Sequence, residues 1–158
     1  MDRSAENSTC APVDSLSLME ASLTLDSDGS RIAHARRLAA DFLAKVRDAL
    51  GVPVMTATVE IVQLIVSELV TNARKYAPGP AVLRLQVTDS VLRIELWDSS
   101  PTLPAARAAN PARIGQHGLE IVTALAQYVT VEAAPLGKCV TAGVDLGKAW
   151  RRRPEAGR

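Results

Sequence analysis

The stretch Ser67-Glu68-Leu69-Val70-Thr71-Asn72-Ala73 lies inside an apolar-rich run that covers residues 59–77. Its Val and Ile content favours a strand by propensity, but its length and 3.6-residue period predict a helix over residues 57–77. The apolar side chains then form one core-facing stripe at i, i+3, i+4 and i+7 spacing, made of Val62, Ile65, Val66, Leu69, Ala73 and Tyr76. We expect the opposite side to be solvated, with Glu60, Gln63, Ser67, Thr71 and Arg74.

Glu68 and Asn72 belong to neither side of this helix. They lie one turn apart at i and i+4, so their side chains align along the edge of the apolar stripe. A carboxylate and a carboxamide at the edge of a core suit a site where a metal-bound polar ligand lies beside a base. The alternative is that both are ordinary boundary residues, hydrogen-bonded to each other or to water.

Composition predicts one globular domain. The chain has 158 residues, of which 47% are hydrophobic and 22% charged, and its formal net charge is +1. Its uncharged apolar runs fall short of the ~18 residues of a membrane span, and we recognise no export signal. Cys10 and Cys139 are too far apart in sequence to define a disulfide framework or a metal site. We therefore expect a cytoplasmic protein.

Three segments are expected. Residues 1–15 form a loose leader, residues 16–147 the domain, and residues 148–158 a basic tail. Such a tail can contact nucleic acid, but no recognition motif accompanies it, and we favour a solvated terminus.

Periodicity and turn residues predict the elements of the domain. We expect strands at 16–25, 83–87, 92–96, 129–131 and 140–144, helices at 31–50, 57–77 and 119–127, and an irregular loop at 99–117. The order β-α-α-ββ-loop-α-ββ predicts an α+β sandwich with helices on one face of a mainly antiparallel sheet. The first helix has a basic side (Arg31, Arg36 and Arg37), which is either a partner surface or simply solvated.

Asp98 continues the alternation of Leu92, Ile94 and Leu96, so its side chain should face inward. A buried carboxylate requires a donor. That donor is either a ligand amine or the backbone of the following loop, for which Asp98 would act as a cap.

The loop ends in Gly115-Gln116-His117-Gly118-Leu119, directly before a predicted helix. Glycines at a helix start allow backbone N–H groups to approach a phosphate, although many helices begin with glycine for steric reasons. We interpret His34 and His117 as incidental.

Together and in this order, these motifs resemble the Bergerat ATP-binding fold of the GHKL superfamily. Within it, the chain is similar to the small anti-sigma-factor serine kinases of the RsbW type, and the resemblance covers about residues 20–147. The family's E-x-x-x-N-A motif matches Glu68 through Ala73. Its adenine-contacting aspartate matches Asp98, its glycine-rich lid motif matches residues 115–119, and its last motif matches residues 137–140.

The resemblance implies a role for each matched residue. Glu68 would be the catalytic base, and Asn72 would bind Mg²⁺ together with the phosphates. Asp98 would accept a hydrogen bond from the exocyclic amine of adenine. The remaining ATP-binding residues would be Gly115, Gly118, Leu119 and Cys139.

The implied function is an ATP- and Mg²⁺-dependent protein serine/threonine kinase. It would phosphorylate an anti-sigma-factor antagonist, bind a sigma factor when not so engaged, and be able to form a homodimer. Two departures keep other functions open. The family's lid usually opens with D-x-G-x-G, whereas Asp98-Ser99-Ser100-Pro101 contains no glycine, and Cys139 stands where the family often has threonine. The alternatives are a non-catalytic, nucleotide-gated binding module and a domain that has lost nucleotide binding.

Overall fold

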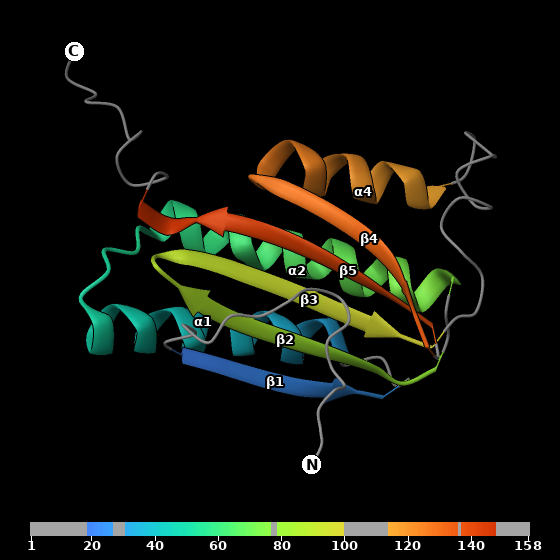
Figure 1. Cartoon of the computed structure of the whole chain (residues 1–158), viewed down its shortest axis with the longest axis horizontal. Helices are drawn as coiled ribbons and strands as arrows, with labels where there is room; N and C mark the ends of the chain where they lie inside the picture. Colours follow the sequence, from blue (N-terminus) through green and yellow to red (C-terminus); the bar gives the residue numbers. More distant parts are fainter. Residues whose placement is uncertain (1–18, 27–30, 77–78, 100–113, 136, 148–158) are drawn as a thin grey trace.

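The computed structural model describes residues 19–26, 31–76, 79–99, 114–135 and 137–147, with side chains described except at 76 and 114–118. Eight elements follow one another along these residues, and Figure 1 shows their arrangement. They are β1 (Met19–Leu25), α1 (Arg31–Leu50), α2 (Thr56–Tyr76), β2 (Ala81–Thr88), β3 (Val91–Asp98), α4 (Ile114–Leu125), β4 (Tyr128–Ala134) and β5 (Gly137–Asp145).

The strands form a single antiparallel sheet in the order β1-β2-β3-β5-β4. The β2–β3 hairpin turns at Asp89 and Ser90, whose φ angles of 54° and 62° are those of a two-residue type I′ loop. The pairing of β3 with β5 is not local, and it sets Leu96 opposite Val140 and Asp98 opposite Lys138. The predicted α+β sandwich is confirmed.

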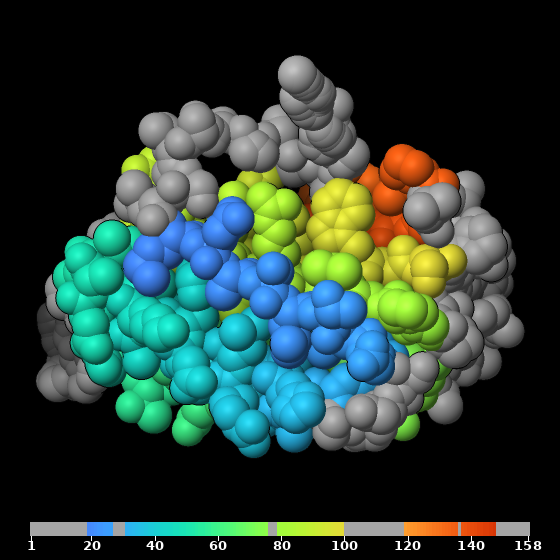
Figure 2. Space-filling model, turned by 90° about the horizontal axis from the view of Figure 1, so that it is seen from below, coloured from blue at the N-terminus to red at the C-terminus, as the bar shows by residue number. Residues whose placement is uncertain are grey.

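The helices cover one face of the sheet, with α2 between α1 and α4 (Figure 1). At the β1 edge, α1 lies alongside β1, as the view from below shows (Figure 2). Gly51, at φ 69°, ends α1 by donating its N–H to the carbonyl oxygen of Arg47 at 3.1 Å, as expected for a glycine that terminates a helix.

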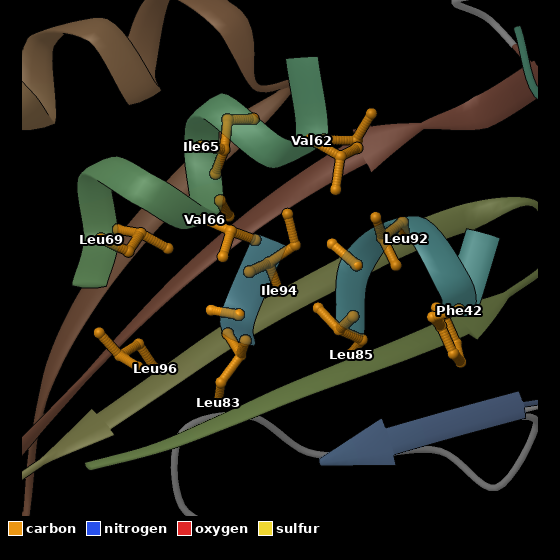
Figure 3. Close-up of a cluster of buried hydrophobic side chains, with 14 of the residues drawn as sticks. Phe42, Val62, Ile65, Val66, Leu69, Leu83, Leu85, Leu92, Ile94 and Leu96 are labelled. Atoms are coloured by element: carbon orange, nitrogen blue, oxygen red, sulfur yellow. The ribbon is translucent and has the colours of Figure 1, made fainter. Parts of the chain in front are cut away.

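The core lies between α1, α2 and the sheet. Figure 3 shows Val62, Ile65, Val66 and Leu69 of α2 facing the apolar residues of β2 and β3. The predicted stripe on α2 is buried from Val62 to Ala73. The apolar period therefore located the face of α2 that packs on the sheet.

Two expectations for the helices were wrong. Arg31 is 1% exposed, so of the three arginines expected on the basic side of α1 only Arg36 and Arg37 are exposed. Gln63, Ser67 and Thr71 are half-buried instead of solvated. For Gln63 and Ser67 the reason is contact with α1, because a helix between two neighbours has little free surface.

The last helix begins earlier than predicted. It starts at Ile114, so Gly115 and Gly118 lie within its first turns and not in a loop before it. Among the described helices, none combines the length and apolar character that a membrane span requires.

The sheet face opposite the helices carries a charged cluster. Glu95, whose side chain is 5% exposed, pairs with Arg84 Nη1 at 3.7 Å and Arg93 Nε at 3.4 Å. Trp97 Nε1 donates to Glu95 Oε1 at 3.3 Å. Because side chains alternate along a strand, Cys139 and Thr141, opposite Trp97 and Glu95 in the register, lie on this same outer face.

Candidate functional site

Glu68 and Asn72 lie on successive turns of α2, at the edge of its buried stripe. Asn72 is 7% exposed and Glu68 is half-buried, while Leu69 between them is 1% exposed and packs in the core. A buried carboxamide beside a partly exposed carboxylate allows one group to hold a ligand while the other exchanges protons with it. The boundary position predicted for the pair is therefore confirmed.

Polar contacts with α1 fix the residue that precedes Glu68. Arg36 Nη1 donates to Ser67 Oγ at 3.1 Å, and Gln63 Nε2 donates to the carbonyl oxygen of Arg36 at 2.9 Å. Ser67 Oγ in turn donates to the carbonyl oxygen of Gln63 at 2.8 Å. These contacts limit the rotation of α2 about its own axis, which would move Glu68.

Asp98 is the last residue of β3 and faces the helices, as predicted from the alternation. It is 9% exposed. Its Oδ2 accepts a hydrogen bond from Lys138 Nζ, and the two side chains form a buried ion pair. The side chain of Asp98 is 2% exposed and that of Lys138 is 3% exposed. The donor that a buried carboxylate requires is thus supplied by the opposite residue of β5.

Lys138, and not Cys139, lies beside Asp98. Cys139 points to the outer face of the sheet, where its Sγ lies 3.7 Å from Thr141 Oγ1. This direction does not agree with the expectation that Cys139 contacts a ligand held by Asp98. The sequence held the signal for Lys138: continuing the alternation Val144, Ala142, Val140 by one step reaches residue 138.

Cys139 also corrects the expectation about cysteines. It is disulfide-bonded, although the spacing in the sequence gave no reason to expect a disulfide. Cys10, the other cysteine of the chain, lies outside the described residues.

Gly137 permits the close approach of β5 to the end of β3. A Cβ atom at this position would overlap the carbonyl oxygen of Asp98 and lie 2.7 Å from the Cα of Ser99. Only a residue without a side chain fits here without a shift of the strands. Gly137 therefore helps to set the register that places Lys138 opposite Asp98.

The two halves of the site lie toward the same end of the molecule. In Figure 3, Leu69 of α2 lies toward the Leu96 end of β3, and Val62 toward the Leu92 end. Asn72 follows Leu69 by three residues and Asp98 follows Leu96 by two, so both continue toward that end.

The predicted lid is described only at its borders. Ser99 Oγ lies 3.5 Å from the carbonyl oxygen of Pro80, which ties the start of the loop to the start of β2. At the other border, the first four N–H groups of a helix have no intrahelical partner. The Gly115 N–H is one of these in α4, whereas Gly118 lies beyond them. Leu119 is half-buried against the core.

This arrangement of an α2 carboxylate–carboxamide pair, a buried aspartate ending β3 and a glycine-bearing helix start agrees with the comparison with known families. A family model described as a histidine kinase-like ATPase domain matches residues 27–144. The chain belongs to the histidine kinase-like ATPase domain family. Membership identifies a GHKL-type domain and implies that the chain binds ATP. No curated protein matches the chain.

The two halves of the site fit ATP differently. At α2, Asn72 offers a carboxamide oxygen, the kind of hard ligand that Mg²⁺ takes alongside phosphate oxygens. Among the described residues, no cluster of three or more His, Cys, Asp or Glu side chains could hold a metal ion without the phosphates. At β3, the carboxylate of Asp98 can accept more than one hydrogen bond, so an amine of adenine would share it with Lys138, which donates to Oδ2.

Proposed function

We propose that this chain is an ATP-dependent protein serine/threonine kinase. It phosphorylates an anti-sigma-factor antagonist and binds a sigma factor when it is not so engaged. The observation that carries the proposal is the Glu68–Asn72 pair: a half-buried carboxylate, suited to act as a base, one helical turn from a buried carboxamide. The similarity to anti-sigma-factor kinases of the RsbW type supports the choice of partners.

Each group has a role in this proposal. When bound, ATP would supply the phosphoryl group and leave as ADP, and Mg²⁺ would neutralise the phosphate charge. Phosphoryl transfer requires mainly positioning, charge neutralisation and a base near the nucleophile. Asn72 would hold the metal through its carboxamide oxygen. Glu68 accepts the proton of the attacking serine or threonine hydroxyl. The start of α4 with Gly115 would hold the phosphates, because the N–H groups of a helix start and the helix dipole favour an anion.

A second function is favoured by a specific observation. The ion pair between Asp98 and Lys138 engages the acceptor expected to contact adenine. The alternative function is a binding module that responds to nucleotide without transferring phosphate, which the glycine-free lid opening after Asp98 also keeps open. The partners would then be exchanged according to the bound nucleotide, with Glu68 as a boundary residue only.

Replacing Glu68 separates the two functions. We expect Glu68→Ala to lower phosphate transfer from labelled ATP to a purified anti-sigma-factor antagonist by about 100-fold or more, the usual effect of losing a general base. ATP binding and sigma-factor binding should persist. Glu60→Ala, which removes an exposed carboxylate two turns earlier on α2, is the matched control and should leave transfer unchanged.

The outcome decides between a kinase and a binding module. Equal transfer in both variants would exclude Glu68 as the base. Absence of transfer in the parent protein, together with sigma-factor affinity that depends on nucleotide, would support the binding module. We further propose that the protein acts in the cytoplasm and forms a homodimer. Sedimentation equilibrium, which measures the mass of the particle in solution, tests the homodimer.

A further inference from the structure

The outer face of the sheet is buried along its middle, although the described helices all lie on the other face (Figure 1). An antiparallel sheet with helices on one face commonly leaves the opposite face to solvent. On β5, however, every residue from Gly137 to Val144 is buried, so this strand is closed on both faces. Of its outward residues, Cys139 is 0% exposed and Thr141 is 2% exposed. The neighbouring edge strand β4 consists instead of exposed and half-buried residues.

Cys139 carries a covalent bond on this face. Its sulfur is part of a disulfide, and the chain contains only two cysteines, so Cys10 is the partner that the chain itself offers. A second copy of the chain is a poor alternative, because the sulfur of another molecule could not approach a side chain that is closed to solvent. Cys10 stands nine positions before Met19, which begins the edge strand β1.

This short segment is long enough to reach Cys139. β1 and β5 are three strand spacings apart, about 14 Å. Through the pairings of β5 with β3, β2 and β1, Cys139 is level with Thr24, five residues or about 17 Å along β1 from Met19. The direct path from Met19 to Cys139 is therefore about 22 Å long. Nine residues in extended conformation reach about 30 Å.

The direct path runs over the outer face, because Cys139 points outward and the helices fill the other face. By the same register, it crosses β2 between Arg84 and Gln86 and crosses β3 at Glu95. Gln86 and Glu95 are the buried polar residues of the outer face on those two strands. Arginine side chains contribute to the burial of Glu95. The pattern of burial and the covalent geometry thus indicate the same route.

We propose that residues 11–18 form a strap across the outer face of the sheet, held at its far end by a disulfide between Cys10 and Cys139. The strap covers the middle of this face while the disulfide is intact and leaves it when the disulfide is reduced. Disulfides of cytoplasmic proteins are usually transient or redox-sensing, so a reversible bond agrees with the proposed location. The inference does not depend on nucleotide binding.

The switch is a thiol–disulfide exchange. Formation of the bond takes two electrons and two protons from the two thiols, and a low-molecular-weight disulfide such as glutathione disulfide accepts them. One cysteine thiolate attacks this oxidant and releases one glutathione, and the other cysteine displaces the second glutathione from the mixed disulfide. Dithiothreitol reverses the change, because it closes into a cyclic disulfide as both cysteines return to thiols.

Limited cleavage of the full chain by subtilisin, a protease that dithiothreitol does not inactivate, tests the strap. Mass spectrometry locates the cuts. We expect protein treated with glutathione disulfide to be cut within residues 11–18 at least about tenfold more slowly than protein treated with dithiothreitol, because cleavage follows the fraction of chain that is released. Peptide mapping without reduction should recover Cys10 and Cys139 linked within one chain.

Two variants complete the test. Cys10→Ser cannot form the bond, so it should be cut at the fast rate under both treatments. Thr9→Ser changes the preceding residue but keeps both cysteines, and it should behave as the parent protein does.

Three results would overturn the inference, and all come from the parent protein, so they count even if Cys10→Ser fails to fold. One is free thiols, or a bond between two chains, after treatment with glutathione disulfide. Another is equal cleavage of residues 11–18 in the two redox states, whether fast or slow. The third is cleavage that spreads into the strands after reduction, which would show that the disulfide holds the fold itself and not a releasable strap.

Discussion

Gly137 and Gly143 both lie on β5. A methyl group at either position would overlap a neighbouring group, but the neighbouring group is not the same at the two positions. At Gly137 the neighbour is the backbone of Asp98 and Ser99, whereas at Gly143 it is the ring of Tyr128, which is 40% exposed. A backbone cannot move without separating β3 from β5, but an exposed ring can turn away.

We therefore expect unequal effects from the same substitution. Gly137→Ala should lower the free energy of unfolding by about 2–3 kcal/mol, as overpacking does where neighbours cannot yield. Gly143→Ala should lower it by less than about 1 kcal/mol, because Tyr128 accommodates the methyl group. Urea unfolding followed by circular dichroism measures both. Equal losses would mean that β5 does not need Gly137 to approach Asp98.

At the scale of one element, the β2–β3 hairpin contains a residue in an unfavourable conformation. Ser90 has φ 62°, a left-handed value that costs a non-glycine residue about 1–2 kcal/mol. Ser90→Gly should remove this strain. The greater freedom of glycine in the unfolded chain offsets about 0.4–1 kcal/mol of the gain. The expected net effect is a gain in unfolding free energy of about 0.5–1 kcal/mol.

Ser22→Gly provides the control for this prediction. Ser22 is exposed on the extended edge strand β1, where glycine relieves no strain and loses about 0.5–1 kcal/mol. Thermal unfolding of the two variants should shift in opposite directions. A destabilised Ser90→Gly would show that the turn at Asp89 and Ser90 is not of type I′.

At the scale of the whole molecule, the order of the sheet predicts where stability is concentrated. β3 and β5 are paired on both sides and carry core residues, whereas β1 and β4 are edges. We expect hydrogen-bonded amides of β3 and β5 to exchange with deuterium at least about tenfold more slowly than those of β1 and β4. Equal protection of β4 and β3 by NMR-detected exchange would contradict this gradient.

Much of this architecture could be predicted because it is encoded locally. The bounds of α1 and α2 follow from apolar period, Gly51 and the prolines, and the inward direction of Asp98 follows from the alternation in β3. The start of α4 was missed because Gly115 and Gly118 resemble loop residues when judged by propensity alone. The burial of Arg31 was missed because a helix period assigns charged residues to the solvent.

The sequence by itself determined the elements, the buried stripe of α2 and the placement of Glu68 and Asn72 at its edge, since these depend on residues within one or two turns of one another. Only the tertiary structure decided what meets Asp98. Alternation along β5 places Lys138 on the same face as Val140 and Ala142, but only the register of β5 on β3 sets it opposite Asp98. That register joins residues forty positions apart and is fixed by the packing of Gly137 and the burial of Val140 and Ala142. No local pattern contains this information, because strand pairing over such a distance depends on how the whole sheet buries its apolar face.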